Sequence, residues 1–171
     1  MVRRTIQRGK WWNILMENKI GFWGTDGPYG AFSNFYPCKF IWNCRQFNCS
    51  EQAFMWAKAR YFNDLESEEL ILKETDPKKI KALGRKVKNF DANKWSDISY
   101  NFMLSANIAK YQQNEELKNK LLNTGKAYLY EDSPFDYLWG VGKDGSGKNL
   151  LGKVLMEVRE YFWSLEIINS D

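Results

Sequence analysis

A carboxylate, an indole and a cluster of glycines lie close together in the last third of this 171-residue chain. Asp136 and Trp139 are followed by four glycines within eight residues, and then by Lys148 and Asn149. Glycines allow main-chain N–H groups to converge on an anion, and the apolar helix predicted from Leu150 adds free N–H groups and a positive dipole end. The segment therefore predicts a site for a phosphate or another polar ligand beside a carboxylate and an indole.

Two other interpretations of this segment have to be weighed. Residues 142–149 come close to a Walker A sequence, but Asn149 stands where a Ser or Thr would ligate Mg²⁺, and the preceding residues are too few and too polar for a buried parallel strand. A glycine-rich surface turn without a ligand stays open. If the segment does bind phosphate, we expect the contacts to come from the N–H groups around Gly145, Gly147 and Asn149 and from the ammonium group of Lys148.

Charge is concentrated at the N-terminus and leaves a neutral body. The net charge of +4 equals that of Arg3, Arg4, Arg8 and Lys10, and the remaining basic residues balance the 21 acidic ones. A neutral body argues against a protein whose main role is to grip nucleic-acid backbone. The stretch 73–94 is locally basic, either as a solvated helix face or as a phosphate-binding face.

The residue types also exclude several classes of protein. The chain has no His, and Cys38, Cys44 and Cys49 lack the paired spacing of a zinc site. We therefore expect no metal and no cofactor, and reduced, structural cysteines in a cytoplasmic protein. No apolar run approaches the ~18 residues of a membrane helix, and the basic N-terminus precedes no secretory apolar region.

The spacing of apolar residues predicts a mainly helical domain with a few short strands. Aromatic and β-branched segments predict strands over 20–23, 39–42 and 127–130. Capping residues and helical periodicity predict helices that begin near Ser50, Asp64, Asp76, Asp91, Asn114 and Leu150. Because strands do not alternate with helices, we expect one compact α+β domain over residues 18–165, between an N-terminal extension (1–17) and a short tail (166–171).

Several short blocks between about Ile20 and Phe162 resemble the NADAR family in their order and spacing. The blocks are 30–37, 49–53, 83–85, Trp95, 123–125, 136–140 and 144–152. The resemblance implies a compact, mainly helical α+β domain with N-glycosidase activity, either on early phosphoribosylated riboflavin intermediates or on ADP-ribose attached to guanine. One position departs from the family: Gln52 stands where a His is common.

The resemblance implies that Glu51, Asp136, Trp95 and Trp139 form the catalytic site. Breaking a ribose–nitrogen bond builds positive charge on C1′ and the ring oxygen, and then requires attack by water. One carboxylate can stabilise the cation and take the proton of the water, a second acid can hold the ribose or protonate the base, and an indole can stack on the base. We expect Glu51, in the first turn of a helix, to be the principal carboxylate and Asp136 to orient ribose or water. Spacing does not decide how the two acids divide these roles.

Four further positions are expected to contact the substrate. Ser33 and Asn34 supply short polar side chains in a turn, and Lys58 and Arg85 could neutralise a phosphate. Surface ion pairs are the alternative for the two cations.

Without the family match, the catalytic positions also have structural interpretations. Glu51 would be a favourable first-turn acid, Asp136 a turn or cap residue, and Trp95 a core residue.

Three functions remain open. The first is hydrolysis of a small phosphorylated ribosyl substrate such as a phosphoribosylaminopyrimidine, without a metal. The second is removal of ADP-ribose from guanine in nucleic acid, which the basic stretch 73–94 and the N-terminal arm favour. The third is a non-catalytic module that binds ADP-ribose or NAD, to which only Gln52 points. No membrane is expected as a partner, and the sequence does not indicate the oligomeric state.

Overall fold

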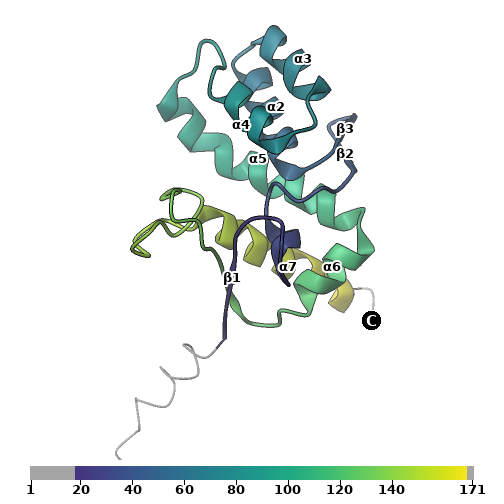
Figure 1. Ribbon diagram of the computed structural model, residues 1–171. Helices are drawn as coiled ribbons and strands as arrows, with labels where there is room; N and C mark the ends of the chain where they lie inside the picture. The colour runs from purple at the N-terminus through teal and green to yellow at the C-terminus, as the bar shows by residue number, and fades with distance from the viewer. Residues whose placement is uncertain (1–17, 169–171) are drawn as a thin grey trace, which may run out of the picture.

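In the computed structural model, which describes residues 18–168, residues in helices far outnumber residues in strands, and the expected α+β class is confirmed (Figure 1). The α-helices are α2 (Ser50–Tyr61), α3 (Leu65–Lys73), α4 (Pro77–Gly84), α5 (Ala92–Gln112), α6 (Glu115–Leu122) and α7 (Leu150–Ile168). The strands are β1 (Lys19–Phe22), β2 (Phe40–Trp42), β3 (Arg45–Phe47) and β4 (Tyr128–Glu131), and η1 (Gly30–Phe32) is a single 3₁₀ turn.

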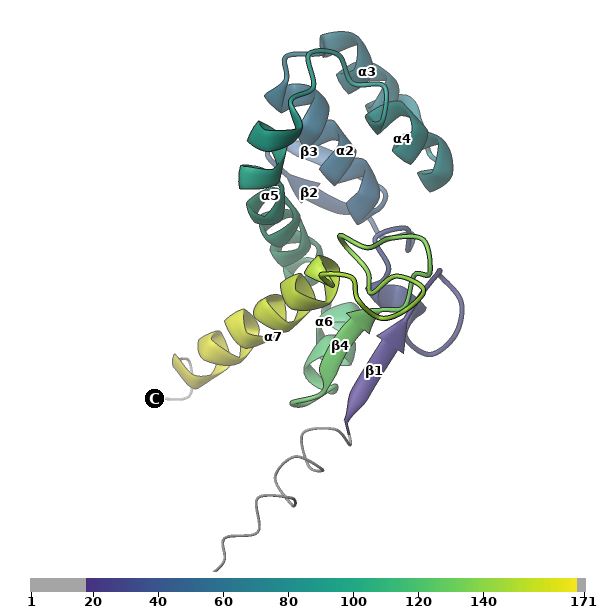
Figure 2. The ribbon, with the colours of Figure 1, turned by 90° about the vertical axis from the view of Figure 1, so that its left-hand side faces the viewer.

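The strands form two separate pairs. β1 and β4 lie side by side in parallel, with Phe22 opposite Glu131 at their carboxyl ends (Figure 2). β2 and β3 form an antiparallel hairpin whose turn residues, Asn43 and Cys44, both have positive φ, as a tight two-residue turn requires. The sequence does predict β1, β2 and β4 to within a residue or two. It misses β3, because Arg45 and Gln46 are exposed and polar.

Helix α2 is the central helix of the group that lies at the top of Figure 1. Its residues 50–57 are all buried, and α3, α4 and α5 pack around it. The residue before the helix, Cys49, occupies the N-cap position without a side-chain cap bond, so the expected cap by Ser50 is wrong. The Ser50 hydroxyl instead donates to Asn107 Oδ1 on α5 over 3.2 Å, which ties the two helices together.

Aspartates begin three of the other helices as the sequence predicts. Asp64 accepts a hydrogen bond from the Ser67 N–H, Asp76 from Lys78 and Asp91 from two N–H groups of its first turn. The cap expected at Asn114 is not formed. Its amide donates to the carbonyls of Lys39 and Lys110 and so joins α5 to the segment before β2.

The ends of the chain are only partly covered by the structure. The basic N-terminal extension expected over 1–17 lies outside the described residues. Helix α7 continues to Ile168 and so passes through the first residues of the expected tail at 166. Within residues 18–168, no helix combines the length and apolar character that crossing a bilayer demands.

Gln52 fastens α2 to the end of α3. Its side chain is fully buried, its Oε1 accepts a 2.7 Å hydrogen bond from the Asn48 N–H, and its Nε2 donates to the carbonyls of Ile71 and Glu74. These carbonyls belong to the last turn of α3 and the residue that follows it, where helix carbonyls lack intrahelical partners. Gln52 is therefore a structural residue that holds the α2–α3 pair.

Replacing Gln52 by Leu should lower the free energy of unfolding by about 2–4 kcal/mol, because it leaves one partly buried N–H and two carbonyls without partners. Urea unfolding followed by circular dichroism measures the effect. The matched control is Gln46→Leu on the exposed face of β3, which should change stability by less than about 0.5 kcal/mol. Equal urea midpoints for Gln52→Leu and wild type would contradict the role assigned to this amide.

Candidate active site

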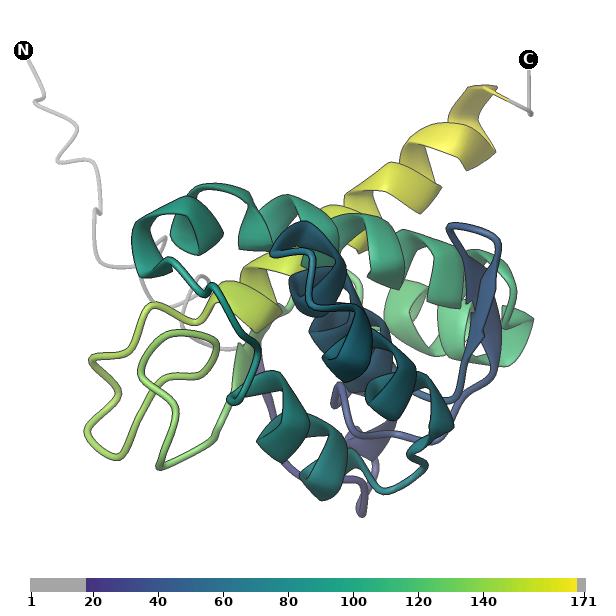
Figure 3. The ribbon, with the colours of Figure 1, turned by 90° about the horizontal axis from the view of Figure 1, so that it is seen from above.

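A cavity of about 170 Å³ lies where α2, α4 and α5 meet the end of β4 and the long loop between β4 and α7. Figures 2 and 3 show this loop, residues 132–149, on the same side of the molecule as α4. The residues that line the cavity are Ser33, Asn34, Phe35, Glu51, Phe54, Met55, Lys58, Lys81, Gly84, Arg85, Trp95, Met103, Glu131, Asp136 and Trp139. Eight of the twelve residues expected from the sequence to form the site are therefore brought together here.

Glu51 lies on the first turn of α2 and is 5% exposed. Its N–H donates to the Asn34 carbonyl over 2.9 Å, which joins the turn after η1 to the start of the helix. The pKa of the carboxyl is raised to about 7, mainly by burial; Lys81 and Arg85 oppose the shift, and the nearby Asp136 adds to it. The dipole of α2 favours an ionised carboxylate in the first turn of the helix, but it does not outweigh this desolvation.

Glu131 is a third acid in the cavity, and the sequence analysis missed it. It ends β4, opposite Phe22 of β1, and its pKa is also raised to about 7. The causes are burial first, then the charge of Asp136, with Lys81 acting in the opposite direction. Among the described residues, no donor is hydrogen-bonded to the carboxylate of Glu131 or Glu51. Each is therefore available to a substrate.

Asp136 begins a turn that also positions Trp139. Its Oδ1 accepts hydrogen bonds from the N–H groups of Leu138 at 2.9 Å and Trp139 at 2.7 Å. The turn role weighed for Asp136 from the sequence is thus present, and the same residue lines the cavity. A carboxylate held at one oxygen by two main-chain donors has a fixed orientation, which suits it to orient a ligand.

Three aromatic rings form one wall of the cavity. Phe54 of α2 lies between Trp95 and Trp139, with ring centroids 5.2 and 5.1 Å away. Trp95 also stacks on Phe102 at 5.8 Å, so it belongs to the aromatic core and to the cavity at the same time. Trp139 comes from the loop 132–149 and is half-buried. Phe54 was not expected at the site.

Three cations face the three acids. Lys81 and Arg85 lie one turn apart at the end of α4, and Lys58 comes from α2. Lys58 Nζ donates to the Gly84 carbonyl over 2.8 Å, and burial lowers the pKa of its ammonium group. Within residues 18–168, neither Lys58 nor Arg85 takes part in an ion pair. The surface ion pairs that the sequence left open as their alternative role are therefore absent from the described residues.

Gly84 explains how α4 comes close enough to present these cations. A Cβ at this position would collide with the Met55 side chain of α2. Glycine therefore lets the two helices approach here without displacing the Met55 side chain. Lys81 was missed in the sequence because the basic stretch 73–94 resembles a solvated face, and one side of α4 in fact borders the cavity.

Ser33 and Asn34 are both buried and border the cavity, as expected. The Ser33 hydroxyl accepts from the Phe35 N–H, and Asn34 Nδ2 donates to the Met103 sulfur over 3.3 Å. Asn34 Oδ1 is buried and has no hydrogen-bond partner among the described residues. Because an unsatisfied buried oxygen costs free energy, it is a candidate acceptor for a ligand donor.

The glycine-rich segment does not reach the cavity. The N–H groups of Gly145, Gly147, Lys148 and Asn149 all donate to main-chain carbonyls of the loop itself, between residues 137 and 142. The next N–H groups, at the start of α7, are taken by the carbonyls of residues 138 and 139. The anion site expected at these amides is therefore not formed, because the loop has used the donors to fold on itself.

The glycines and Asn149 serve this folding directly. Gly145 has φ +76°, and a Cβ at Gly147 would collide with the main chain of Gly140 and Val141. The Asn149 side chain is buried and bonded to β4. The Lys148 side chain is exposed and is not among the residues that border the cavity. Composition alone could not reveal these partners.

The chain is similar to several known proteins over most of its length. The family model described as the NADAR domain matches residues 21–163. Protein irg-1 of Caenorhabditis elegans is 37% identical over 168 residues, which cover 82% of this chain and 79% of that protein. Riboflavin biosynthesis protein VVA0006 of Vibrio vulnificus is 35% identical over 146 residues, which cover 85% of this chain but 39% of that protein.

A bacterial relative supports the fold as well as the sequence match. N-glycosidase YbiA of Escherichia coli is 33% identical over 148 residues, which cover 86% of this chain and 91% of YbiA. The NMR structure of YbiA is similar with a TM-score of 0.79 at 32% identity, over 88% of both chains. The family model spans most of the chain and includes every residue that lines the cavity. This chain therefore belongs to the NADAR domain family.

Proposed function

We propose that this chain is an N-glycosidase that hydrolyses the ribose–nitrogen bond of a phosphoribosylated heterocycle. The observation that carries the proposal is one cavity that holds three carboxylates, three cations and two indoles. The chemistry needs an acid, a base, an anion-binding group and a stacking surface, and protein side chains supply all four. The names of YbiA as an N-glycosidase and of VVA0006 as a riboflavin biosynthesis protein support the same reaction.

Two glutamates of the cavity, Glu51 and Glu131, divide the proton chemistry. Both have a pKa raised to about 7, so close to neutrality the pair holds one proton between them. Glu51 is stabilised as an anion by both Lys81 and Arg85, whereas among these cations only Lys81 opposes the shift at Glu131. The two cations beside Glu51 favour its ionised form, which suits it to act as the base that takes the proton of the attacking water. Glu131 keeps the proton and donates it to the departing nitrogen.

Asp136 and the indoles position the sugar and the base. The fixed carboxylate of Asp136 accepts ribose hydroxyls and stabilises the positive charge that develops at C1′. Trp139, at the mouth formed by the loop 132–149, stacks on the heterocycle, and Trp95 closes the aromatic wall behind Phe54. Ser33 and Asn34 supply a hydroxyl and an amide oxygen to the polar edge of the base.

The cations select a phosphorylated sugar. Arg85 is exposed at the rim while Lys81 and Lys58 lie deeper, so a 5′-phosphate at the rim meets a guanidinium suited to bidentate contacts. The cavity of about 170 Å³ is smaller than the ~300–1,000 Å³ typical of pockets for drug-sized ligands. This size favours a phosphoribosylaminopyrimidine over a larger ADP-ribosyl substrate.

Incubation with a phosphoribosylaminopyrimidine and with an ADP-ribosyl-guanine oligonucleotide, followed by mass analysis, tests the choice of substrate. Ribose phosphate and free pyrimidine are the expected products. Release of ADP-ribose alone would favour the second substrate, and tight binding of ADP-ribose without any product would favour a non-catalytic module.

Glu51→Gln should lower kcat by about 10²–10⁴, because the amide keeps the shape of the carboxyl but cannot accept the proton of the water. Steady-state kinetics measure the loss, and circular dichroism confirms the fold. Asp132→Asn is the matched control, since Asp132 follows Glu131 but is exposed and borders a different groove. An unchanged rate for Glu51→Gln would exclude Glu51 as the base.

The pH dependence of kcat/KM should be bell-shaped with its maximum near pH 7. Below that pH, Glu51 becomes protonated and the base is lost, and above it Glu131 loses the proton that the leaving nitrogen needs. The Glu131→Gln variant should be slow at every pH and should show no fall on the alkaline side. A wild-type rate that stays level up to pH 9 would contradict the role of Glu131.

Arg85→Ala should raise KM for the 5′-phosphorylated substrate about tenfold, because one charge-assisted contact is lost. KM for the dephosphorylated nucleoside should hardly change. The comparison of the two substrates separates phosphate binding from an indirect effect on Glu51. Lys86→Ala is the control, because Lys86 is the exposed neighbour and does not border the cavity. Equal increases of KM for both substrates would exclude Arg85 as the residue that binds the phosphate.

A further inference from the structure

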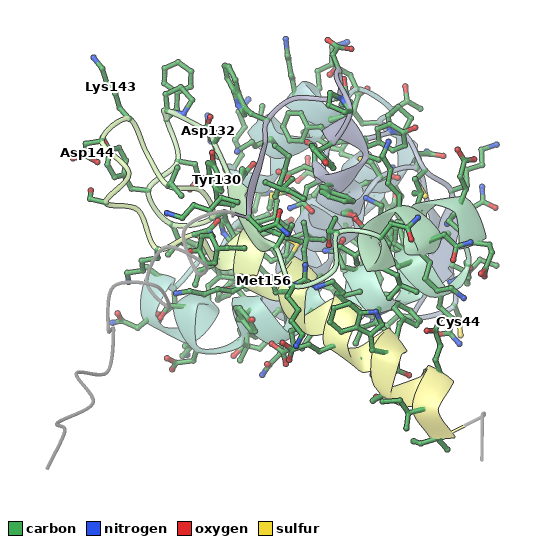
Figure 4. All side chains as sticks on the ribbon, turned by 90° about the horizontal axis from the view of Figure 1, so that it is seen from below. Cys44, Tyr130, Asp132, Lys143, Asp144 and Met156 are labelled. Atoms are coloured by element: carbon green, nitrogen blue, oxygen red, sulfur yellow. The ribbon has the colours of Figure 1, made fainter. Side chains whose placement is uncertain are left out.

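A second and larger hollow lies on the other side of β4 from the catalytic cavity. It has a volume of about 1320 Å³ and is bounded by β4, the loop 132–149 and one side of α7. Successive side chains of a strand point to opposite faces. Glu131 therefore borders the catalytic cavity, while Tyr130 and Asp132 border this groove. Figure 4 shows Tyr130 and Asp132 between the loop that carries Lys143 and the helix that carries Met156.

The floor of the groove offers a flat aromatic surface. Tyr128 and Tyr130 are stacked with their ring centroids 6.5 Å apart and their planes 21° apart, and Tyr128 is 40% exposed. Gly21 of β1 lies opposite Tyr130, and a Cβ there would be 2.7 Å from the Tyr130 ring. Glycine at this position lets the tyrosine lie across β1. Trp163 of α7 borders the groove from the other side.

A buried guanidinium faces the same groove without a carboxylate partner. Arg159 is 4% exposed, and its Nη1 donates to Thr124 Oγ1 at 2.7 Å and to the Ala127 carbonyl at 2.9 Å. Its Nε is buried and makes no hydrogen bond within residues 18–168, where Arg159 also forms no ion pair. The guanidinium carbon lies 5.3 Å from the centre of the Trp163 ring, and the charge of Glu160 favours the protonated form, but no carboxylate of the described residues is hydrogen-bonded to the group. An anion in the groove would therefore supply the direct partner that this buried cation lacks.

Lysines add to this positive charge at the rim. Lys19, Lys126 and Lys143 are exposed around the groove, against the two acids Asp132 and Glu160. None of the three lysines forms an ion pair with another described residue. The groove therefore combines a net positive lining with stacked aromatic rings.

We infer that this groove binds a free nucleoside monophosphate, separately from the catalytic cavity. The phosphate contacts Arg159 and the rim lysines, and the planar base stacks on the Tyr128–Tyr130 surface. An acidic peptide would satisfy the charge but would leave the exposed tyrosine faces unused. A polynucleotide would need a line of cations across the surface, whereas here one buried arginine marks a single point. The inference concerns a second site and does not depend on the proposed reaction.

Titration of the ¹⁵N-labelled full chain with AMP, followed by the signals of tryptophan indoles and glycine amides, tests this inference. The Trp163 indole and the amides of Gly145 and Gly147 should shift progressively as AMP rises to a few millimolar. Adenosine and inorganic phosphate should each bind more weakly than AMP. Shifts confined to Trp95 and Trp139, an equal response to phosphate alone, or no shift at all would each overturn the inference.

Charge reversal at the rim supplies the second measurement. The double variant Lys126→Glu, Lys143→Glu should weaken AMP binding about tenfold, since two exposed cations near the phosphate are inverted. Lys39→Glu, Lys94→Glu makes the same change in net charge at exposed positions that do not border the groove, and should bind AMP as wild type does. Equal weakening of AMP binding in both double variants would show that only the net charge of the protein matters, and would also overturn the inference.

Discussion

The side chain of Asn149 holds together the segments on which the site depends. Its Oδ1 accepts from the Glu131 N–H at 3.0 Å, and its Nδ2 donates to the Leu129 carbonyl at 2.9 Å, so one amide fastens the start of α7 to β4. Its own N–H donates to the Gly140 carbonyl, which adds the loop 132–149 to the same junction. The residue has φ 53°, a conformation that Asn tolerates better than most other residues. Without this junction, Glu131, Asp136 and Trp139 would not be fixed relative to one another.

The fold places two of the cavity's acids away from water, and this desolvation raises their pKa values. Glu51 and Glu131 are shifted from 4.5 to about 7 mainly by burial. A carboxyl whose folded pKa is raised contributes stability that is fully present below its unfolded pKa and is lost as the pH rises through 7. The loss is on the order of 3 kcal/mol for each group at most, and a well-packed helix such as α2 can offset it. The same desolvation gives the two acids the pKa values that acid–base chemistry at neutral pH requires.

Sequence reasoning succeeded where a local pattern carries the information and failed where partners come from distant segments. Cap aspartates and apolar periodicity located the helices, and the blocks around Glu51, Asp136 and Trp139 identified three residues that share the cavity. Glu131 was missed because a glutamate at the end of a short strand looks like a surface residue until β4 is placed against α2 and α4. The glycine-rich loop was misjudged for the opposite reason. Its composition suits an anion, but the partners of its N–H groups are carbonyls of the same loop, and no pattern of residue types reveals them.

The alternation of β4 places the two binding surfaces in mechanical contact. Tyr130, Glu131 and Asp132 are consecutive, and Glu131 alone of the three borders the catalytic cavity while its neighbours border the groove. Asn149 bonds to the Tyr128 hydroxyl on the groove side and to the Glu131 N–H, so it touches both surfaces through one side chain. A ligand on the tyrosines would therefore lie one hydrogen-bonded residue away from Glu131, the proposed proton donor.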